Sequence, residues 1–138
     1  MTVIVTDAGF GPDTHAGGFV PLAELPANDC ALAGVDLPSD AAPEALEGRV
    51  LFARAIRVDF PSFADGRGFT LARLLRLRGY KGRLRARGHL LADQYAMARR
   101  AGFDEVEIDD ALAARQPEEQ WLARADWQAH DYQSRLRG

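Results

Sequence analysis

Three groups of charged residues in the sequence are candidates for binding an anion, and the first is a loop. Asp65-Gly66-Arg67 lies in a polar loop between an extended apolar stretch ending at Phe60 and an arginine-containing helical pattern. Gly66 permits a sharp turn, and Arg67 beside a helix start favours an oxyanion or a carboxylate, because guanidinium groups and helix amino ends attract negative charge. The alternative is that Asp65 and Gly66 only form the turn, and that Arg67 pairs within the loop.

A second candidate is Arg85, in the middle of residues 82–88, where arginine alternates with apolar residues. Parallel sheets usually have both faces covered, so three arginines on one strand face are unusual. Arg85 is therefore expected either on the solvent-exposed face of an edge strand or buried with a carboxylate partner. Burial without a partner would cost too much free energy. Asp59, Asp93 and Asp109 are the expected partners.

A third candidate is Asp93-Gln94, which opens the next helical pattern. Asp93 either favours the positive end of the helix dipole or joins Arg67 and Arg85 in one polar cluster. Ligands of parallel α/β proteins bind beyond the carboxyl ends of the strands, where all three candidates are expected. The predicted binding residues are Asp65, Gly66, Arg67, Arg85, Asp93 and Gln94.

The elements that would position these residues follow a repeated order. Each stretch of strand pattern is followed by a helical pattern, four times over, which predicts an α/β fold with a mainly parallel sheet, either half-barrel-like or open. The strands are expected at 31–37, 51–60, 82–88 and 103–108, and the helices at 38–48, 70–79, 90–102 and 109–132, the last interrupted at Pro117. Thr70 is the expected N-cap of the second helix.

The chain is expected to contain an irregular N-terminal segment, 1–28, and a single α/β domain, 29–138. Within the first segment, residues 3–6 fit a short strand, and the Gly-rich stretch after them fits an exposed loop. Trp121 and Tyr132 are expected on a last amphipathic helix. This helix could also form the interface of a homodimer, an alternative that the sequence leaves undecided.

The composition of the 138 residues is that of a folded protein, with 47% hydrophobic and 27% charged residues. The net charge of −3 hides a segregation, because residues 1–48 carry −8, residues 49–100 carry +10 and residues 101–138 carry −5. Without a long apolar run or a signal-peptide pattern, we expect a cytoplasmic protein that does not span a membrane. The single Cys30, expected to pack in the first of the four strands, and the scattered histidines predict no metal site, and no cofactor motif is present.

The blocks "FPSFADGRGFTLARLLRLRGYKGRLRARG", "LLADQ", "ARRAGFDEVEI" and "WQAHDYQ" resemble a bacterial family of unknown function. Its genes often stand beside that of the haemoprotein of assimilatory sulfite reductase, and some members are labelled oxidoreductases without stated chemistry. The resemblance implies a link to sulfate assimilation. It also singles out as motif residues Phe60, Pro61, Phe63, Asp65, Gly66, Arg67, Arg76, Arg85, Gly88, Asp93 and Gln94.

Two functions are expected from these observations. The first is an accessory or interaction protein of sulfite reduction, which binds an acidic partner, such as sulfite reductase, or an oxyanion at an arginine-rich strand-end edge. The alternative is a small enzyme or anion-binding sensor, with a pocket formed by Asp65, Arg67, Arg85 and Asp93 and a carboxylate as the acid–base group. Nucleic-acid binding is the third hypothesis. The net negative charge and the lack of a nucleic-acid-recognition motif with interleaved aromatic residues speak against it.

Overall fold

The computed structural model describes residues 2–15, 18–24, 34–46, 48–125 and 127. Its strands are β1 (Thr2–Thr6), β2 (Gly9–Gly11), β3 (Val20–Pro21), β4 (Gly34–Leu37), β5 (Ala55–Phe60), β6 (Arg83–Gly88) and β7 (Glu105–Asp109). Its α-helices are α1 (Arg67–Leu77), α2 (Tyr95–Ala101), α3 (Asp110–Arg115) and α4 (Glu118–Leu122). Short 3₁₀ turns occur at η1 (Leu22–Glu24), η2 (Pro43–Ala45), η3 (Gly48–Phe52) and η4 (Ala92–Gln94). The predicted Cys30 packing and the Tyr132 position lie outside the described residues.

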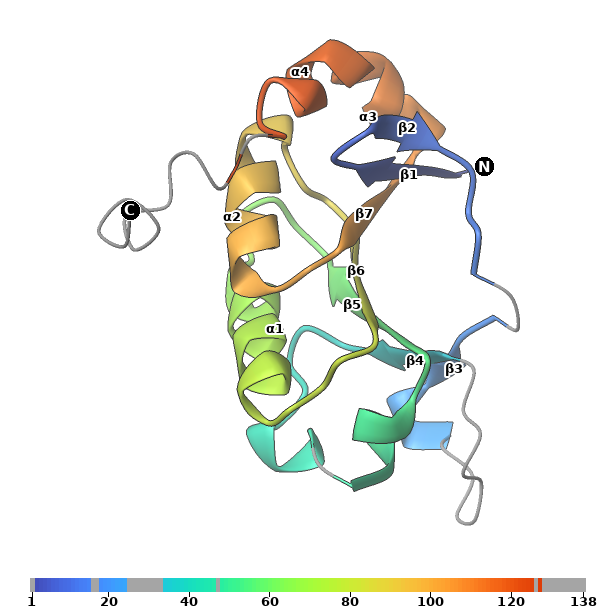
Figure 1. The fold of residues 1–138 in the computed structure, drawn as a ribbon, viewed down its shortest axis with the longest axis vertical. Helices are drawn as coiled ribbons and strands as arrows, with labels where there is room; N and C mark the ends of the chain where they lie inside the picture. Colours follow the sequence, from blue (N-terminus) through green and yellow to red (C-terminus); the bar gives the residue numbers. More distant parts are fainter. Residues whose placement is uncertain (1, 16–17, 25–33, 47, 126, 128–138) are drawn as a thin grey trace.

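The described strands form one open sheet in the order β2-β1-β7-β6-β5-β4-β3 (Figure 1). Strands β3 to β7 run parallel, while β1 is antiparallel to both β2 and β7. The prediction of an α/β fold with a mainly parallel sheet is confirmed, and of the two sheet shapes the open one is correct. The four predicted strands correspond to β4, β5, β6 and β7, and β1 confirms the short strand expected at residues 3–6.

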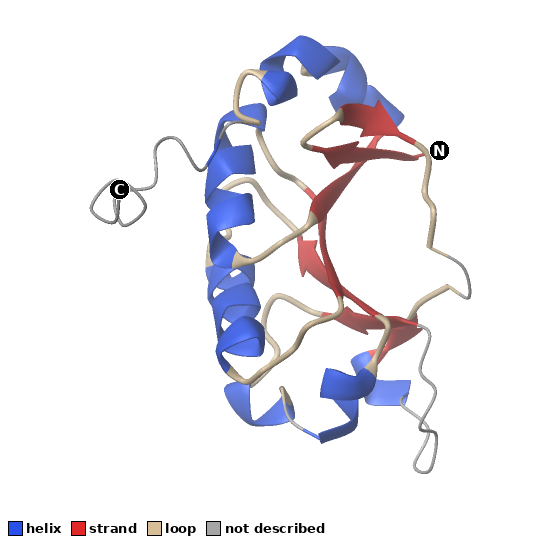
Figure 2. Cartoon of the chain, viewed as in Figure 1, coloured by secondary structure: helices blue, strands red, loops and turns tan. Residues whose placement is uncertain are grey.

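Helices α1 and α2 lie on one face of this sheet, and residues 12–15, which follow β2, lie on the other side (Figure 2). The covered face carries the apolar half of each alternating strand, so that β5 and β6 direct fully buried side chains towards α1. Helix α1 meets them with its i, i+3, i+4 stripe. The centre of this core contains Ile56, Val58, Phe60, Leu71, Leu75, Leu84, Ala86 and Phe103.

Two helix predictions are corrected. Thr70 is not an N-cap, because α1 begins at Arg67; the Asp65 carboxylate accepts a hydrogen bond from the Arg67 amide at 3.0 Å and so occupies one of the free N–H groups of the first turn. The helix predicted over 38–48 is replaced by η2 and η3. Pro43, in the middle of that stretch, is the first residue of η2 and prevents a regular helix from running through it, and Gly48, with a φ of +66°, ends the stretch outside the helical region.

Residues predicted to form an exposed loop after β1 instead include strand β2, which pairs with β1 as a hairpin. The Phe10 amide on β2 donates to Glu118 Oε2 of α4 at 2.8 Å. A side chain of α4 therefore occupies a hydrogen-bonding group on the outer edge of the sheet. No helix in the described part of the chain is long and apolar enough to cross a membrane.

Candidate functional site

The sheet face opposite α1 and α2 is lined by charged side chains, which we call the charged face. It consists of Asp36 on β4, Arg57 and Asp59 on β5, Arg83, Arg85 and Arg87 on β6, and Glu105 and Glu107 on β7. The register sets these residues in rows, because Arg57 lies beside Arg85, and Arg87 lies between Asp59 and Glu107. Cross-strand neighbours on one face of a sheet interact directly, so opposite charges fall into contact.

The arginines and carboxylates of the charged face form a continuous network of ion pairs. Asp36 receives two hydrogen bonds from Arg57, at 2.6 and 2.9 Å. Glu107 Oε1 accepts from Nη1 of Arg57 at 3.2 Å and from Nη1 of Arg85 at 2.7 Å. Glu105 bridges two arginines of β6, accepting from Nε of Arg83 at 2.7 Å and from Nε of Arg85 at 2.5 Å.

Arg85 is at the centre of this network and has no exposed surface. Besides the two glutamates, it donates from Nη1 and Nη2 to the Asp13 carboxylate, at 3.0 and 2.8 Å. Burial would lower the pKa of Arg85, but the hydrogen bonds and charges of these carboxylates raise it above its usual value. Of the two alternatives for Arg85, the buried and paired one is confirmed. The expected partners Asp59, Asp93 and Asp109 are wrong, because its partners are Asp13, Glu105 and Glu107.

Towards the carboxyl ends of the strands the network becomes accessible, around Asp59 and Arg87. The Arg87 side chain is 49% exposed, and its contact with Glu107 Oε2 is long, at 3.7 Å. Asp59 is exposed and makes no hydrogen bond or ion pair with the described residues. We call Asp59 and Arg87, with the cavities that they line, the strand-end site.

Two cavities flank the strand-end site. One, of about 560 Å³, lies over the ends of β5, β6 and β7 and includes His89 and Arg115 in its lining. The other, of about 600 Å³, extends towards β4 and includes Asp36 and Arg57. Asp59 and Arg87 line both. These volumes are in the range of small-molecule sites, and the position agrees with ligand binding beyond the carboxyl ends of parallel strands.

The predicted loop residues Asp65 and Arg67 are brought together. Arg67 donates to both oxygens of Asp65, at 2.9 and 2.7 Å, and to Ser39 Oγ at 3.1 Å. These hydrogen bonds hold the pKa of Asp65 below its usual value. Gly66 is the residue before α1 and has a φ of −86°, so the positive φ expected there is not used. The cavity beside Arg67, about 320 Å³, shares no lining residue with the strand-end site.

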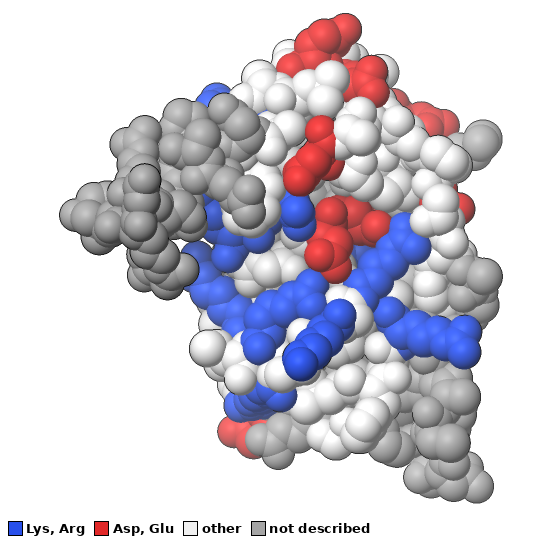
Figure 3. Space-filling model, in the orientation of Figure 1, with Lys and Arg blue, Asp and Glu red and all other residues white. Residues whose placement is uncertain are grey.

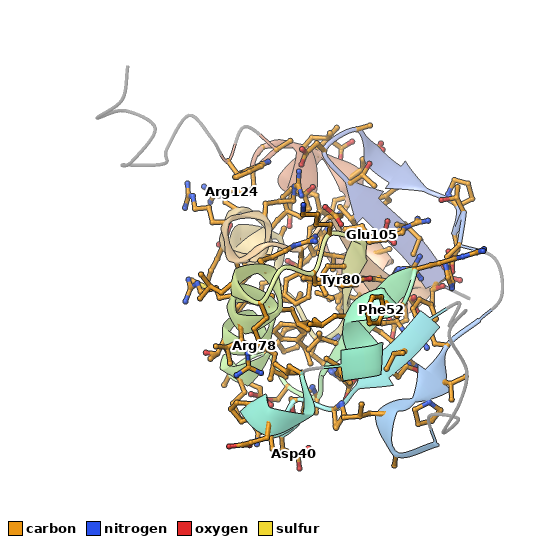
Figure 4. All side chains as sticks on the ribbon, turned by 60° about the horizontal axis from the view of Figure 1, so that its bottom comes forward. Asp40, Phe52, Arg78, Tyr80, Glu105 and Arg124 are labelled. Carbon is orange, nitrogen blue, oxygen red and sulfur yellow. The ribbon has the colours of Figure 1, made fainter. Side chains whose placement is uncertain are left out.

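Asp93 and Gln94 make no hydrogen bond or ion pair with Arg67 or Arg85, the arginines with which they were expected to cluster. Asp93 pairs with Arg124 at 2.8 Å on the surface. Gln94 accepts from the Leu91 amide at 2.8 Å and donates to the carbonyl oxygen of Phe63 at 3.2 Å. Arg124 and Asp40, which lines the cavity of Arg67, lie at opposite ends of the molecule (Figure 4). Whether any of the six predicted residues binds a ligand stays a prediction.

Many of the basic residues lie at the other end of the strands. Figure 3 shows Lys and Arg side chains gathering over α1 and the turn that follows it, where the chain carries Arg73, Arg76, Arg78 and Lys81. Arg76 has a structural role, since it donates to the carbonyl oxygens of Tyr80, Gly82 and Gly102. The bases behind the +10 charge of residues 49–100 are therefore divided between the charged face, α1 and the turn after it, α2, and the connecting segments.

Sequence reasoning missed the strand-end role of Arg87 and the pairing role of Glu105 and Glu107. A signal was present: glutamate alternates with valine at 105–107, and arginine alternates with apolar residues at 83–87. Matching two period-2 charge patterns of opposite sign would have predicted neighbouring strands with their charges on one face. Asp13 had no such signal, because it lies 72 residues from Arg85 and outside any strand.

Residues 34–138 match the family described as bacterial protein of unknown function (DUF934). The chain belongs to this family. The matched residues include all the strands that carry the charged face, whereas Asp13 precedes them. The comparisons with curated proteins and with solved structures found no match.

Proposed function

We propose that this member of the family is an accessory protein of sulfite reduction, which binds an oxyanion or an acidic group of a partner protein at the strand-end site. The observation that carries the proposal is Arg87, which is half exposed between two cavities and whose only ion pair with the described residues is a 3.7 Å contact with Glu107. A guanidinium group in this situation can form bidentate hydrogen bonds with a sulfur or phosphorus oxyanion or with a carboxylate.

Arg87 suits this role better than the two arginines that the sequence favoured. Arg85 has all its donor nitrogens engaged by carboxylates and no exposed surface. Arg67 is 60% exposed but already holds a bidentate carboxylate, that of Asp65. Arg67, which lines a separate cavity, would then serve as a second contact for a large acidic partner.

The link to sulfite reduction rests on the sequence resemblance, and the cavities support the anion-binding part of the proposal. Their lining is mixed, with Arg87 and Arg115 near Asp59, Glu107 and Asp109. The carboxylates would disfavour a highly charged anion such as a nucleotide polyphosphate, because like charges raise the cost of binding. A small anion with one or two charges fits this balance.

The test is calorimetric titration of the full chain with sulfite, sulfate and phosphate at constant ionic strength, with chloride as the balancing ion. Wild type should bind at least one of them, and Arg87→Ala should weaken binding by about tenfold or more, the loss of one charge-assisted contact. Arg73→Ala, on the exposed side of α1, is the matched control and should bind like wild type. Equal binding by Arg87→Ala and wild type would refute the anion site.

The partner role has a separate test. Tagged wild type should retain the haemoprotein of sulfite reductase from cells grown on sulfate, and Arg87→Ala with Arg67→Ala should retain less. Recovery of no sulfite reductase by wild type would remove the partner from the proposal and leave the small anion.

A small enzyme is the second candidate, and Asp59 favours it. This exposed carboxylate lines both cavities beside Arg87, where it can transfer a proton to or from an anion held by the guanidinium. The acid–base group then differs from Asp65 and Asp93, which were expected from the sequence. Asp59→Asn distinguishes the two functions, because an enzyme would lose turnover and keep its anion affinity, whereas a binding protein would have no turnover to lose.

A further inference from the structure

The contact between Asp13 and Arg85 has the geometry of a bound ligand. Both carboxylate oxygens of Asp13 meet the two terminal nitrogens of one guanidinium group, at 3.0 and 2.8 Å. Glu105 and Glu107, on the neighbouring strand, hold the Nε and Nη1 atoms of Arg85. The two terminal nitrogens of Arg85, which we call its fork, are thus held in place by the sheet. The carboxylate bound to the fork comes from Asp13, in a distant part of the chain.

The segment that supplies this occupant has few attachments of its own. Residues 12–14 are exposed and belong to no helix or strand, and the Asp13 side chain is 41% exposed. Its neighbour Thr14 accepts one hydrogen bond from Arg83 at 2.8 Å, while His15 bonds locally to Gly18. Asp13 Oδ1 also accepts a hydrogen bond from the His15 amide at 2.9 Å, and the His15 ring centroid lies 4.6 Å from that of Phe19. Among the described hydrogen bonds and ion pairs, residues 12–14 therefore meet the strands of the charged face only through Asp13 and Thr14.

The ring of Phe19 encloses the same place. The guanidinium carbon of Arg57 lies 4.1 Å from the ring centroid, and that of Arg85 lies 5.3 Å from it. Aromatic faces stabilise guanidinium groups and keep them positioned for an anion. The Phe19 ring therefore lies against the guanidinium groups of both Arg57 and Arg85.

The charges of the network favour one negative charge at this position. Asp59, the fourth carboxylate of the charged face, lies at the exposed strand ends and forms no ion pair with the described residues. Within the ion-pair network, Arg57, Arg83, Arg85 and Arg87 meet Asp36, Glu105 and Glu107, which leaves one positive charge in excess. The Asp13 carboxylate neutralises it. A free anion that replaced Asp13 would restore the same balance, so that the site would not be left with an uncompensated buried charge.

We propose that the fork of Arg85 is a binding site for a small free anion with two oxygens available, a carboxylate or a sulfur oxyanion, and that Asp13 is its displaceable internal occupant. The inference goes beyond the strand-end site, because it uses Arg85 and Phe19 and does not need Arg87. A tethered carboxylate competes at an effective concentration in about the millimolar range or above. A free anion must overcome this competition, and loss of Asp13 should increase its affinity.

The test compares calorimetric titrations of the full chain with formate, sulfite and sulfate, at constant ionic strength balanced with chloride. Asp13→Ala should bind one of these anions at least about tenfold more tightly than wild type. Asp13→Asn, which keeps an oxygen and the shape of the side chain, should show the same direction and serves if the alanine variant does not fold. Thr14→Ala is the matched control, because it removes a contact of the same segment and leaves Asp13 in place.

Arg87→Ala separates this inference from the strand-end site. The double variant Asp13→Ala with Arg87→Ala should keep the increased affinity, whereas Arg87→Ala alone loses the binding assigned to the strand-end site. Binding to the Asp13 variants that is no tighter than to wild type overturns the inference. So does increased binding that disappears with Arg87, which would assign the anion to the strand-end site alone.

Discussion

Replacing Arg85 by methionine tests whether the charged face is a single network of ion pairs. The variant removes one buried cation and leaves Glu105 and Glu107 in place, each with 5–6% of its side chain exposed. Loss of one partner from a buried ion pair costs about 3–5 kcal/mol, because the remaining charge stays out of water without compensation.

The structure places the expected loss at the lower end of that range. Glu105 keeps Arg83, Glu107 keeps Arg57, and the half-exposed Asp13 can be solvated by water. We therefore expect Arg85→Met to lower the free energy of unfolding by about 3 kcal/mol. Arg83→Met is the matched control on the same face of the same strand. Its side chain is 28% exposed, and its loss should cost about 1 kcal/mol or less.

The assay is urea unfolding of both variants followed by circular dichroism. A loss of about 3 kcal/mol lowers the midpoint by roughly 1–2 M urea at m-values of about 1.5–3 kcal/mol/M. If Arg85→Met is no less stable than Arg83→Met, at an unchanged m-value, the carboxylates do not depend on Arg85 and the reasoning about the charged face is refuted.

Three further changes test other parts of the structure. Tyr80→Phe removes a hydroxyl whose oxygen lies 3.1 Å from two carbonyl oxygens, and it should lower stability by about 1–2 kcal/mol in the same urea assay; an unchanged midpoint would contradict this. Gly88→Ala should cost about 1–3 kcal/mol, because Gly88 has a φ of +116° and an added Cβ would meet the Phe60 carbonyl oxygen at 2.6 Å; wild-type stability would show that the turn relaxes. Hydrogen bonds from Arg85 hold the pKa of Asp13 below its ordinary value of about 3.9, so its stabilisation is complete above about pH 4 and is lost as the pH falls. The stability difference between wild type and Asp13→Asn should therefore shrink in acid, and a difference independent of pH would contradict the assignment.

Local patterns were enough to predict most of the α/β core. Alternating apolar residues mark β5, β6 and β7, and Gly79 and Gly102 follow α1 and α2 closely. Capping follows from the local sequence where the side chain itself makes the bond, as at Asp109, which accepts from the Leu112 amide at 2.7 Å. It failed at Thr70, because the hydrogen bond from the Arg67 amide to Asp65 starts α1 one turn earlier.

The candidate site was predictable only in its location. The rule for parallel sheets pointed to the carboxyl ends of the strands, where the cavities of Asp59 and Arg87 lie. The sequence did not show that, in the described part of the chain, α1 and α2 both lie on one face of the sheet. This decides whether an arginine on the other face meets solvent or carboxylates. Arg85 and Arg87 are both arginines on the same face of β6, two residues apart, yet Arg85 is buried and Arg87 is half exposed.

By itself, the sequence determined which stretches form strands and helices and which side chains share a face, because these depend on periods of two and 3.6 residues along the chain. Only the tertiary structure decided that β6 lies between β5 and β7, which sets arginines beside glutamates, and that Asp13 reaches across to Arg85. Strand order depends on packing across the whole sheet: the charge patterns of β6 and β7 can indicate that these two strands are neighbours, but they do not fix the order of the sheet. No local pattern encodes the contact of Asp13 with Arg85.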